Sequence, residues 1–445
     1  MGRRSHSRAL SIWANGERVG AWRIPARGEP ELVYDPAWMA APAGRPLSLS
    51  LPLASGGLKG AVVNSYFDNL LPDSRAIRER IATRFGTAST DAFELLQAVG
   101  RDCIGAIQLL AEDDAPASLH KISGTPMSVD EVEALLLQTV TPGRLGGLPE
   151  EADALRISLA GAQEKTALLW HDQQWMRPHG ATPTTHILKL PLGLVGHRQA
   201  DFSTSVENEW LCLNILGAYG LAVPRCAILG FGSQKVLAVE RFDRQLHSSG
   251  SWLMRLPQED FCQALGVPSH LKYEADGGPG LLDLAKILQQ SVHAREDLRT
   301  LLAAQLVFWM LAAPAGHAKN FSIHLLPQGR FRLAPLYDVM SIWPVEGAGP
   351  NQFSRHDAKL AMAVMGKNRH YRRSTIQRRH FNATARLCGH GPDAEDIVAS
   401  VLDATPGVIA RMESQLPPGF PPKVAQSILG GLAASAKALE AMPAD

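Results

Sequence analysis

Two polar residues in the C-terminal half of the chain have a spacing that suits magnesium and phosphate chemistry. Asn320 ends the polar loop GHAKN, and Asp338 follows eighteen residues later, after a segment with the pattern of a β-hairpin. A hairpin returns the chain to its starting point, so an amide oxygen and a carboxylate at these positions can hold one Mg²⁺ between phosphate oxygens. The pattern therefore predicts a metal site for phosphoryl transfer.

The same loop lacks the acid that phosphoryl transfer to a hydroxyl group normally uses. In protein kinases an aspartate stands five residues before the metal-binding asparagine and accepts the proton of the substrate hydroxyl. Counted back from Asn320, that position is Ala315, whose methyl group can neither accept a proton nor orient a hydroxyl. Loss of a general base costs on the order of 10²–10⁴ in rate. We expect nucleotide and Mg²⁺ binding to survive, because the residues that would carry them remain.

A turn of small residues upstream is a candidate for phosphate binding. The segment AGAQ at 160–163 lies between two predicted strands, where backbone N–H groups can face phosphate oxygens. Most such turns are only turns, so this one is weak evidence alone. The nearby Lys165-Thr166 invites a Walker A interpretation, but that motif needs a second glycine and a following helix. Here the glycine is absent and a strand is predicted to follow, which argues against a P-loop NTPase.

A lysine and a glutamate further along the chain have the arrangement that kinases use. Lys189 stands in the apolar strand 186–191, where it must either extend to solvent or meet an anion. Glu209 lies in the helix that follows, and a strand lysine paired with a helix glutamate holds the α- and β-phosphates in kinases. Any helix has spare glutamates, however. At 239–243 an apolar strand turns polar, which fits either a hinge that offers backbone groups to adenine or an ordinary strand end.

The elements that must position these residues can be predicted from the patterning. Residues 8–35 indicate a β-hairpin, because Asn15-Gly16 stands between alternating apolar residues. Pro72 lies near the start of a predicted helix, and a strand ends this first region near residue 113. Residues 110–150 are rich in Pro, Ser and acidic residues, which is typical of a linker; a helix, VDEVEALLLQTV, is predicted inside it.

From residue 154 onward, predicted strands surround one helix. This helix has apolar residues at helical spacing, Thr204 and Glu207 in capping-box register, and an end at Gly220. Beyond about residue 255 the chain is predicted to be mostly helical, apart from the hairpin between Asn320 and Asp338.

Composition limits the possible classes of protein. The chain has 445 residues, 45% hydrophobic and 20% charged, with a formal net charge of +1. That length allows roughly two to three domains, and the near-neutral charge excludes attraction of the whole molecule to nucleic acid. The five cysteines show no CxxC or zinc spacing, which is typical of a reducing cytosol. With no signal peptide and no apolar run of membrane-spanning length, we predict a cytoplasmic protein without a membrane partner.

Several long segments resemble the HipA family, the toxin kinases of bacterial HipA–HipB toxin–antitoxin pairs. They are SLSLPL, FDNLLPDS, ISLAGAQEKTALL, THILKLP, VERFDR, RLPQEDFCQ, KYEADGGPG, GHAKNFSI and LYDVMS, and they run nearly end to end. The resemblance implies an ATP-dependent Ser/Thr protein kinase with an α+β, phosphatidylinositol-kinase-like core. The expected division is a small β-rich N-terminal α/β domain at 1–113, a linker with a helix at 114–150, a β-rich N-lobe at 151–254 and a mainly helical C-lobe at 255–445.

The family's functional positions fall on this sequence one by one. The resemblance assigns ATP binding to Ala160, Gly161, Ala162, Gln163, Glu164, Lys165, Lys189, Glu209, Glu240, Arg241, Phe242, His317, Ala318, Lys319, Asn320, Tyr337 and Asp338. It assigns Mg²⁺ to Asn320 and Asp338, and catalysis to these two, Lys319 and position 315. It also assigns autophosphorylation to Ser158, which from the sequence alone is an ordinary strand serine. A phosphate there, with a charge near −2, would repel nucleotide phosphates.

The chain departs from the family at one catalytic position. The family has Asp-Gly-His-x-Lys-Asn where this chain has Ala-Gly-His-Ala-Lys-Asn. Natural loss of activity usually affects several site residues, whereas here the other parts of the site are present. We therefore interpret Ala315 as an engineered substitution that makes a poisonous kinase safe to express, with a natural pseudokinase as the alternative.

A basic stretch and the resemblance together predict partners. The segment KNRHYRRSTIQRRHF (367–381) is either a solvated face or a phosphate contact, with Arg378 and Arg379 as candidates to touch DNA or a partner. The resemblance implies a HipB-like antitoxin and, through it, operator DNA, so an antitoxin-binding co-repressor is the alternative function. It also implies an aminoacyl-tRNA synthetase, such as the glutamyl enzyme, as the protein substrate, whose phosphorylation causes growth arrest and persistence.

Overall fold

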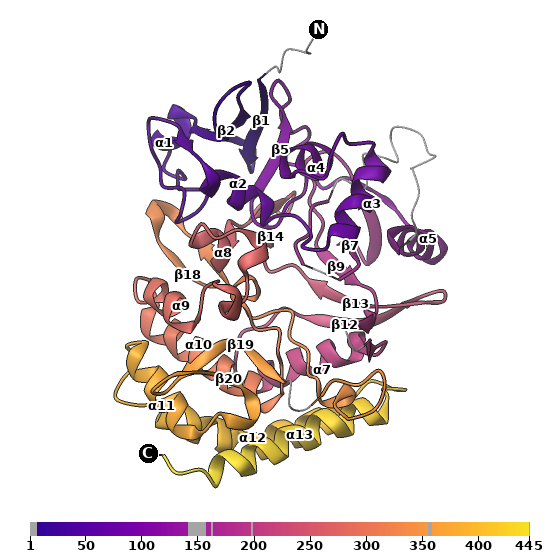
Figure 1. Ribbon diagram of the computed structural model, residues 1–445. Helices are drawn as coiled ribbons and strands as arrows, with labels where there is room; N and C mark the ends of the chain where they lie inside the picture. Colours follow the sequence, from indigo (N-terminus) through magenta and orange to yellow (C-terminus); the bar gives the residue numbers. More distant parts are fainter. Residues whose placement is uncertain (1–6, 141–156, 162, 197–198, 355–357, 445) are drawn as a thin grey trace.

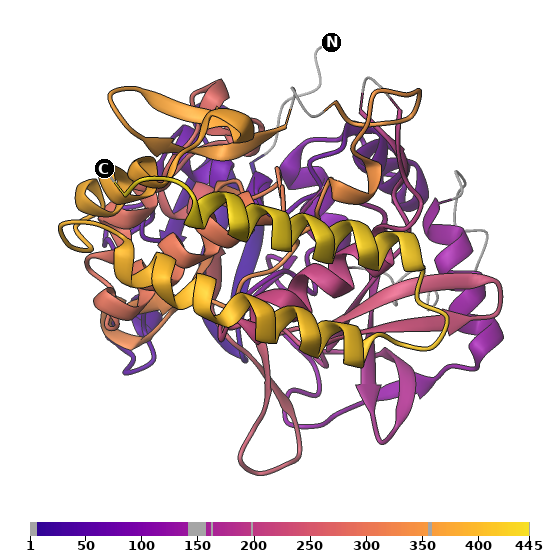
Figure 2. The ribbon, with the colours of Figure 1, turned by 90° about the horizontal axis from the view of Figure 1, so that it is seen from below.

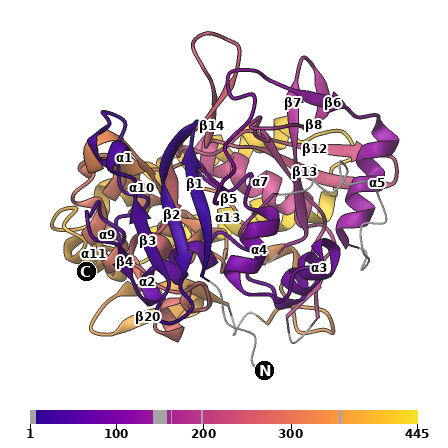
Figure 3. The ribbon, with the colours of Figure 1, turned by 90° about the horizontal axis from the view of Figure 1, so that it is seen from above.

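The computed structural model describes residues 7–140, 157–161, 163–196, 199–354 and 358–444. Its N-terminal part is a five-stranded antiparallel sheet in the order β4-β3-β2-β1-β5, with four helices (Figure 1). The elements are β1 (Arg8–Ala14), β2 (Glu17–Ile24), β3 (Glu31–Tyr34), α1 (Pro36–Ala40), β4 (Leu58–Lys59), α2 (Ala61–Asp68), α3 (Arg75–Phe85), α4 (Ala92–Val99) and β5 (Ile107–Ala111). In its core Trp22 stacks on Phe67 with ring centroids 4.0 Å apart, which fixes α2 to the sheet. Figure 3 shows β1, β2 and β3 side by side at this end of the molecule.

The middle of the chain forms a six-stranded antiparallel sheet in the order β12-β13-β9-β7-β8-β6. Its elements are β6 (Gly124–Pro126), α5 (Val129–Val140), β7 (Lys165–His171), β8 (Gln174–Pro178), β9 (His186–Lys189), α7 (Ser205–Ala218), β12 (Cys226–Phe231) and β13 (Gln234–Glu240), followed by the small hairpin of β14 (Arg244–Leu246) and β15 (Leu253–Arg255). Two further short strands, β10 (Gly193–Val195) and β11 (Ala200–Phe202), pair with each other. Side chains alternate along β13: Val236 belongs to the core of α5, and Leu237 to the core of α7. The sheet therefore lies between these two helices.

The C-terminal part contains the largest hydrophobic core, and α10 lies at its centre. The elements are β16 (Gln258–Asp260), α8 (Phe261–Ala264), η1 (Ser269–Leu271), η2 (Glu274–Asp276), α9 (Leu281–Leu288), α10 (Ala294–Met310), η3 (Ala318–Asn320), β17 (Ser322–Leu325), η4 (Pro327–Gly329), β18 (Phe331–Leu333), η5 (Trp343–Val345), β19 (Lys359–Met365), β20 (Arg369–Arg372), η7 (Arg373–Thr375), α11 (Arg378–Leu387), α12 (Glu395–Gln415) and α13 (Pro422–Glu440). Figure 2 shows α12 and α13 lying side by side across the end opposite the N-terminal sheet. Both pack on α10.

Most of the local predictions are confirmed. Asn15 and Gly16 have φ of 48° and 84°, as the tight turn between β1 and β2 requires, and the linker helix is α5. The predicted capping box is wrong: Thr204 makes no side-chain bond to the helix, and Glu207 Oε1 instead accepts a hydrogen bond from Lys235 Nζ of β13 at 2.6 Å. The backbone of Thr204 is not extended, so its hydroxyl group cannot reach the first turn.

The N-terminal part has a hydrophobic core of its own. One hydrophobic core lies within residues 10–109, apart from the cores of the later segments, and on this basis we keep the domain division made from the sequence as a proposal. The region after residue 255 also contains a hairpin, β19–β20, that the sequence analysis did not predict. None of the helices within the described ranges combines the length and apolar character that a bilayer span requires.

Candidate active site

Three side chains far apart in the sequence meet between the six-stranded sheet and the C-terminal part. Lys189 Nζ donates hydrogen bonds to Glu209 Oε1 at 2.5 Å and to Asp338 Oδ1 at 2.8 Å. Lys189 and Glu209 are buried, whereas 29% of the Asp338 side chain is exposed, so Asp338 can accept a further partner. Asn320 is adjacent, since its Nδ2 donates to the main-chain oxygen of Asp338 at 3.3 Å.

The fold explains why these side chains meet. Lys189 ends β9, which is held by β7 on one side and β13 on the other. Glu209 lies in α7, the helix packed on that face of the sheet. Asp338 follows β18 with a φ of +60°, which non-glycine residues rarely adopt. Backbone conformations of this kind are enriched at functional sites, which fits the role expected for Asp338.

Charge compensation favours the charged forms of Asp338 and Lys189. Burial alone would raise the pKa of Asp338, but Lys189 and then Lys165 outweigh it and hold that pKa well below its usual value. Burial would lower the pKa of Lys189, yet Asp338 and Glu209 raise it above its usual value. For Glu209 burial is the larger effect, and its pKa is raised. Asp338 is therefore the firmly anionic member of the cluster.

The loop after α10 is folded around Asn320. Asn320 Nδ2 donates to the main-chain oxygen of Ala315 at 2.6 Å, and the His317 N–H donates to the same oxygen at 2.8 Å. Because the amide nitrogen is used by the main chain, the amide oxygen is the atom available to a cation. Gly316 is needed here, since a Cβ would lie 2.6 Å from the Phe308 ring. The loop has a fixed shape although position 315 holds alanine.

These residues line one cavity of about 280 Å³, near the size of small-molecule sites. The structure brings together most of the positions that the sequence analysis selected. Those that line the cavity are Ala160, Gly161, Gln163, Lys165, Lys189, Glu209, Glu240, Arg241, Phe242, Ala315, His317, Lys319, Asn320, Tyr337 and Asp338.

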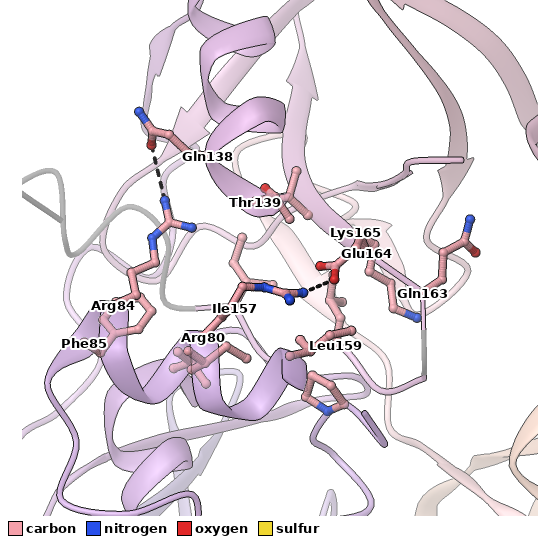
Figure 4. Close-up of a pocket in the computed structure, with 15 residues that line it drawn as sticks. Arg80, Arg84, Phe85, Gln138, Thr139, Ile157, Leu159, Gln163, Glu164 and Lys165 are labelled. Atoms are coloured by element: carbon pink, nitrogen blue, oxygen red, sulfur yellow. Dashed lines mark hydrogen bonds and ion pairs between the residues drawn. The ribbon is translucent and has the colours of Figure 1, made fainter. Parts of the chain in front are cut away.

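Three described positions that the sequence analysis assigned to ATP binding or autophosphorylation do not line this cavity. Glu164 turns to the other side of its loop, where it pairs with Arg80 of α3 in a second, smaller pocket (Figure 4). Ala318 is fully buried in the large core. Ser158 is also fully buried. Ala162, which was also selected, lies outside the described residues.

The small-residue turn places an ammonium group close to its backbone. Gly161 has a φ of +108°, and a Cβ there would lie 2.5 Å from Lys165 Nζ. Burial, followed by repulsion from Lys189, lowers the pKa of Lys165 from 10.5 to about 8, although Asp338 and Glu209 attract the ammonium. An anion added next to the turn would therefore stabilise the charge on Lys165.

The segment 239–243, a candidate hinge, contains one residue that holds the fold together and one that lines the cavity. The Arg241 guanidinium pairs with Asp243 at 2.8 Å and with Asp102 of the N-terminal part at 3.4 Å, so this side chain holds the fold together. The Phe242 and Tyr337 rings are 5.7 Å apart at 38° and both line the cavity. They form an aromatic wall on which a flat ring can stack.

Sequence reasoning missed several cavity residues. It gave no role to Asp73, whose carboxylate contacts Lys319 Nζ at 2.8 Å and Lys272 Nζ at 2.7 Å. It also passed over Tyr273, whose ring meets that of His317 edge-on at 4.9 Å. These residues belong to FDNLLPDS and KYEADGGPG, so the available signal was their place in segments that carry the family resemblance.

A β-rich lobe and a mainly helical lobe that enclose a Lys–Glu pair and an Asn–Asp pair define the class of protein-kinase-like folds. Family models agree: that of the HipA N-terminal domain matches residues 10–110, and that of the HipA-like C-terminal domain matches residues 157–409. The chain belongs to the HipA family. The predicted fold class, a kinase-like core preceded by an N-terminal domain, is thereby confirmed.

Curated relatives and a solved structure support the same assignment. The chain is 33% identical over 408 residues to the putative kinase Y4mE of Sinorhizobium fredii, covering 91% of this chain and 92% of that protein. It is 26% identical over 336 residues to the serine/threonine-protein kinase toxin HipA of Shewanella oneidensis, covering 72% and 70%. Its fold is similar to that of a chain in the complex of HipA, HipB and operator DNA from Shewanella oneidensis, with a TM-score of 0.77, 21% identity and 96% coverage of both chains.

Proposed function

We propose that this chain binds ATP and Mg²⁺ between its two lobes, in the site where its family transfers a phosphoryl group to serine or threonine, and that Ala315 disables the transfer. The observation that carries this proposal is the junction of Lys189, Glu209 and Asp338 beside Asn320. Kinase folds use such a junction to fix phosphates and metal at once. The curated names of its relatives as kinases support the same reaction class.

The residues present fit a magnesium ion. Asp338 supplies an ionised, partly exposed carboxylate and Asn320 an amide oxygen, which are the hard oxygen ligands that Mg²⁺ prefers. These two protein ligands suffice in this proposal, because Mg²⁺ is usually bound by one or two protein oxygens, with phosphate oxygens and water completing its coordination. When bound, Mg²⁺ would neutralise charge on the phosphates.

The other cavity residues have separate roles in this proposal. Lys165 and Lys189 attract phosphate oxygens, and Gly161 lets the loop backbone approach them. Phe242 and Tyr337 enclose the adenine ring. Burial and the neighbouring Lys272 lower the pKa of His317 to about 4, so this imidazole is neutral at pH 7 and can donate or accept a hydrogen bond there.

Ser158 fits a regulatory role for the same loop. Its Oγ donates to the main-chain oxygen of Leu70 at 2.7 Å, and the side chain is fully buried. A phosphate with a charge near −2 has no room there, so a phosphorylated Ser158 would have to leave this position and take the adjoining turn with it. We propose that autophosphorylation at Ser158 inactivates the site in this way. The protein substrate is proposed to be an aminoacyl-tRNA synthetase, such as the glutamyl enzyme, so that growth arrest and persistence follow.

ATP affinity is expected to fall as pH rises above 8. The lowered pKa of Lys165 means that the free protein loses this proton near pH 8, whereas a bound triphosphate favours the charged form. Binding above pH 8 must take up a proton, which costs at most about tenfold in affinity per pH unit. Titration calorimetry with ATP, with and without Mg²⁺, measures this change in affinity.

Two variants test the role of Lys165. Lys165→Met should weaken ATP binding and remove its pH dependence, and Lys437→Met, at an exposed site on α13, should leave both unchanged. Absence of ATP binding at every pH would refute the proposed site.

A second candidate function is that of a co-repressor with a HipB-like antitoxin on operator DNA. The fold it shares with a chain of a toxin–antitoxin–operator complex supports it. Within the basic stretch, however, Arg378 is paired with Glu395, and the Arg373 guanidinium lies 4.3 Å from the centre of the Trp343 ring. Arg372 and Arg379 are exposed and better placed for phosphate contact than Arg378.

Charge reversal of Arg372 and Arg379 is expected to weaken operator binding by the complex of this protein with its antitoxin. Each lost phosphate contact should reduce the slope of log affinity against log salt by about one. Fluorescence anisotropy with labelled operator at several salt concentrations measures this slope. Arg411→Glu, on an exposed part of α12, is the control. An unchanged slope would assign the basic stretch to a solvated face.

A further inference from the structure

The connection between α2 and α3 in the N-terminal part reaches into the cavity. It is anchored from both sides: Asp68 accepts hydrogen bonds from Arg78 Nη1 at 2.6 Å and from Ser269 Oγ at 2.5 Å. Asn69 Nδ2 donates to the main-chain oxygen of Val267 at 2.9 Å. This connection (residues 69–73) is thereby hydrogen-bonded both to α3 of its own part of the chain and to the C-terminal part.

Asp73, at the end of the connection, is the counter-ion of two lysines. Its Oδ1 lies 2.8 Å from Lys319 Nζ and its Oδ2 lies 2.7 Å from Lys272 Nζ. Lys319 Nζ also donates to the main-chain oxygen of Asn69 at 3.3 Å. Only 3% of the Lys319 side chain is exposed, so its position depends on these acceptors.

The same connection also holds the small-residue turn. The Asp73 N–H donates to the main-chain oxygen of Gly161 at 3.0 Å, and Pro72 forms a β-bridge with Gly161. Leu70 accepts the Ser158 hydroxyl, as described above. One short segment of the N-terminal domain therefore fixes both the turn proposed to bind phosphates and the lysine of the catalytic loop.

The charge state of Asp73 decides what it can do. Burial would raise its pKa, but Lys319 and Lys272 outweigh burial and lower it to about 2. Asp73 is therefore anionic at neutral pH and a poor proton acceptor, since an effective general base has a pKa near the working pH. It cannot replace the carboxylate missing at position 315. Its negative charge instead occupies lysines that a terminal phosphate would otherwise attract.

We propose that Asp73 is a positioning residue that the N-terminal domain contributes to the site. It holds Lys319 and Lys272 in place, and its carboxylate competes with the terminal phosphate of the nucleotide for them. This inference rests on the proposed ATP site. Asp73 then has two opposing effects: it weakens ATP binding, and it increases the rate of phosphoryl transfer.

Asp73→Asn separates these two effects, because asparagine keeps the size of the side chain and removes its charge. Calorimetry on the chain as it stands should show ATP binding about tenfold tighter, because one repelling charge near the phosphates is gone. The affinity for adenosine, which lacks phosphates, should not change. In the Ala315→Asp background the same substitution should lower kcat by about tenfold, because Lys319 is less well held. A residue with a merely structural role would instead weaken binding and turnover together.

Two further variants keep the test decisive. Asp276→Asn removes an exposed charge on η2 and should leave ATP affinity unchanged. Lys272→Met removes one of the contested lysines and should weaken ATP binding. If the unaltered chain binds ATP but Asp73→Asn binds it equally or less tightly, the inference on Asp73 is wrong and the ATP site stands. If neither protein binds ATP, the proposed function fails and this inference with it.

Discussion

Replacing Ala315 by aspartate is expected to raise the rate of phosphoryl transfer to serine by about 10²–10⁴-fold, the usual contribution of a general base. The loop is already folded for this residue. The main-chain oxygen of Ala315 accepts hydrogen bonds from Asn320 and His317, and Ala315 itself lines the cavity next to the proposed metal ligands. The substitution changes one side chain and requires no other part of the loop to be rebuilt.

The increase in the rate of phosphoryl transfer is measured as incorporation of phosphate from labelled ATP. Mass spectrometry then tests whether the phosphate is on Ser158. Ala315→Asn is the matched control, because it has nearly the same shape as aspartate but cannot accept the proton at neutral pH. Adding Asp338→Asn to the aspartate variant should abolish labelling, since the firmly anionic residue proposed to hold Mg²⁺ is lost. Expression of the aspartate variant should also arrest growth. A variant that binds ATP and Mg²⁺ yet labels neither itself nor another protein would contradict the kinase assignment.

The part of the site that could be predicted from the sequence is local or family-specific. Asn320 and Ala315 share one loop with a known spacing, and the partner of Lys189 was sought in the next helix because that arrangement recurs in kinases. The contact of Lys189 with both Glu209 and Asp338 agrees with that expectation. The predictions of strands and helices followed from the periodicity of apolar residues, which is a local property of the sequence.

The parts that could not be predicted are ion pairs between distant segments. The sequence suggested that the backbone of Arg241 could face a nucleotide, but it did not indicate that the guanidinium would contact Asp102. Nor did it indicate that Asp73 of the N-terminal part would pair with Lys319 of the C-terminal part. No period or spacing relates such residues, because their proximity arises only when two domains dock. The failed capping box has a similar cause, since Glu207 pairs with Lys235 of a neighbouring strand instead of with its own helix end.

The ion pairs around Asp102 have the largest expected effect on stability. Asp102 is buried and contacts three guanidinium groups: that of Arg255 at 2.7 Å, of Arg244 at 2.9 Å and of Arg241 at 3.4 Å. Asp243 pairs with Arg241 and Arg244, so in Asp102→Asn the buried Arg255 loses its carboxylate. Removing one partner of a buried ion pair costs about 3–5 kcal/mol. We expect a loss of that size in the free energy of unfolding.

The pH dependence of stability distinguishes this cause from general damage. Burial would raise the pKa of Asp102, but Arg255, Arg244 and Arg241 hold it far below its ordinary value of 3.8. The stabilisation by Asp102 is therefore present above about pH 4 and is lost as pH falls below that value, because the unfolded chain then takes up a proton before the folded one. Urea titrations at pH 7 and pH 3 should show the unaltered protein losing stability between them, and Asp102→Asn losing correspondingly less. Asp172→Asn, at a largely exposed carboxylate, should behave as the unaltered protein. If Asp102→Asn and the unaltered protein are equally stable at pH 7, then other groups balance the charges of the three arginines and the prediction is wrong.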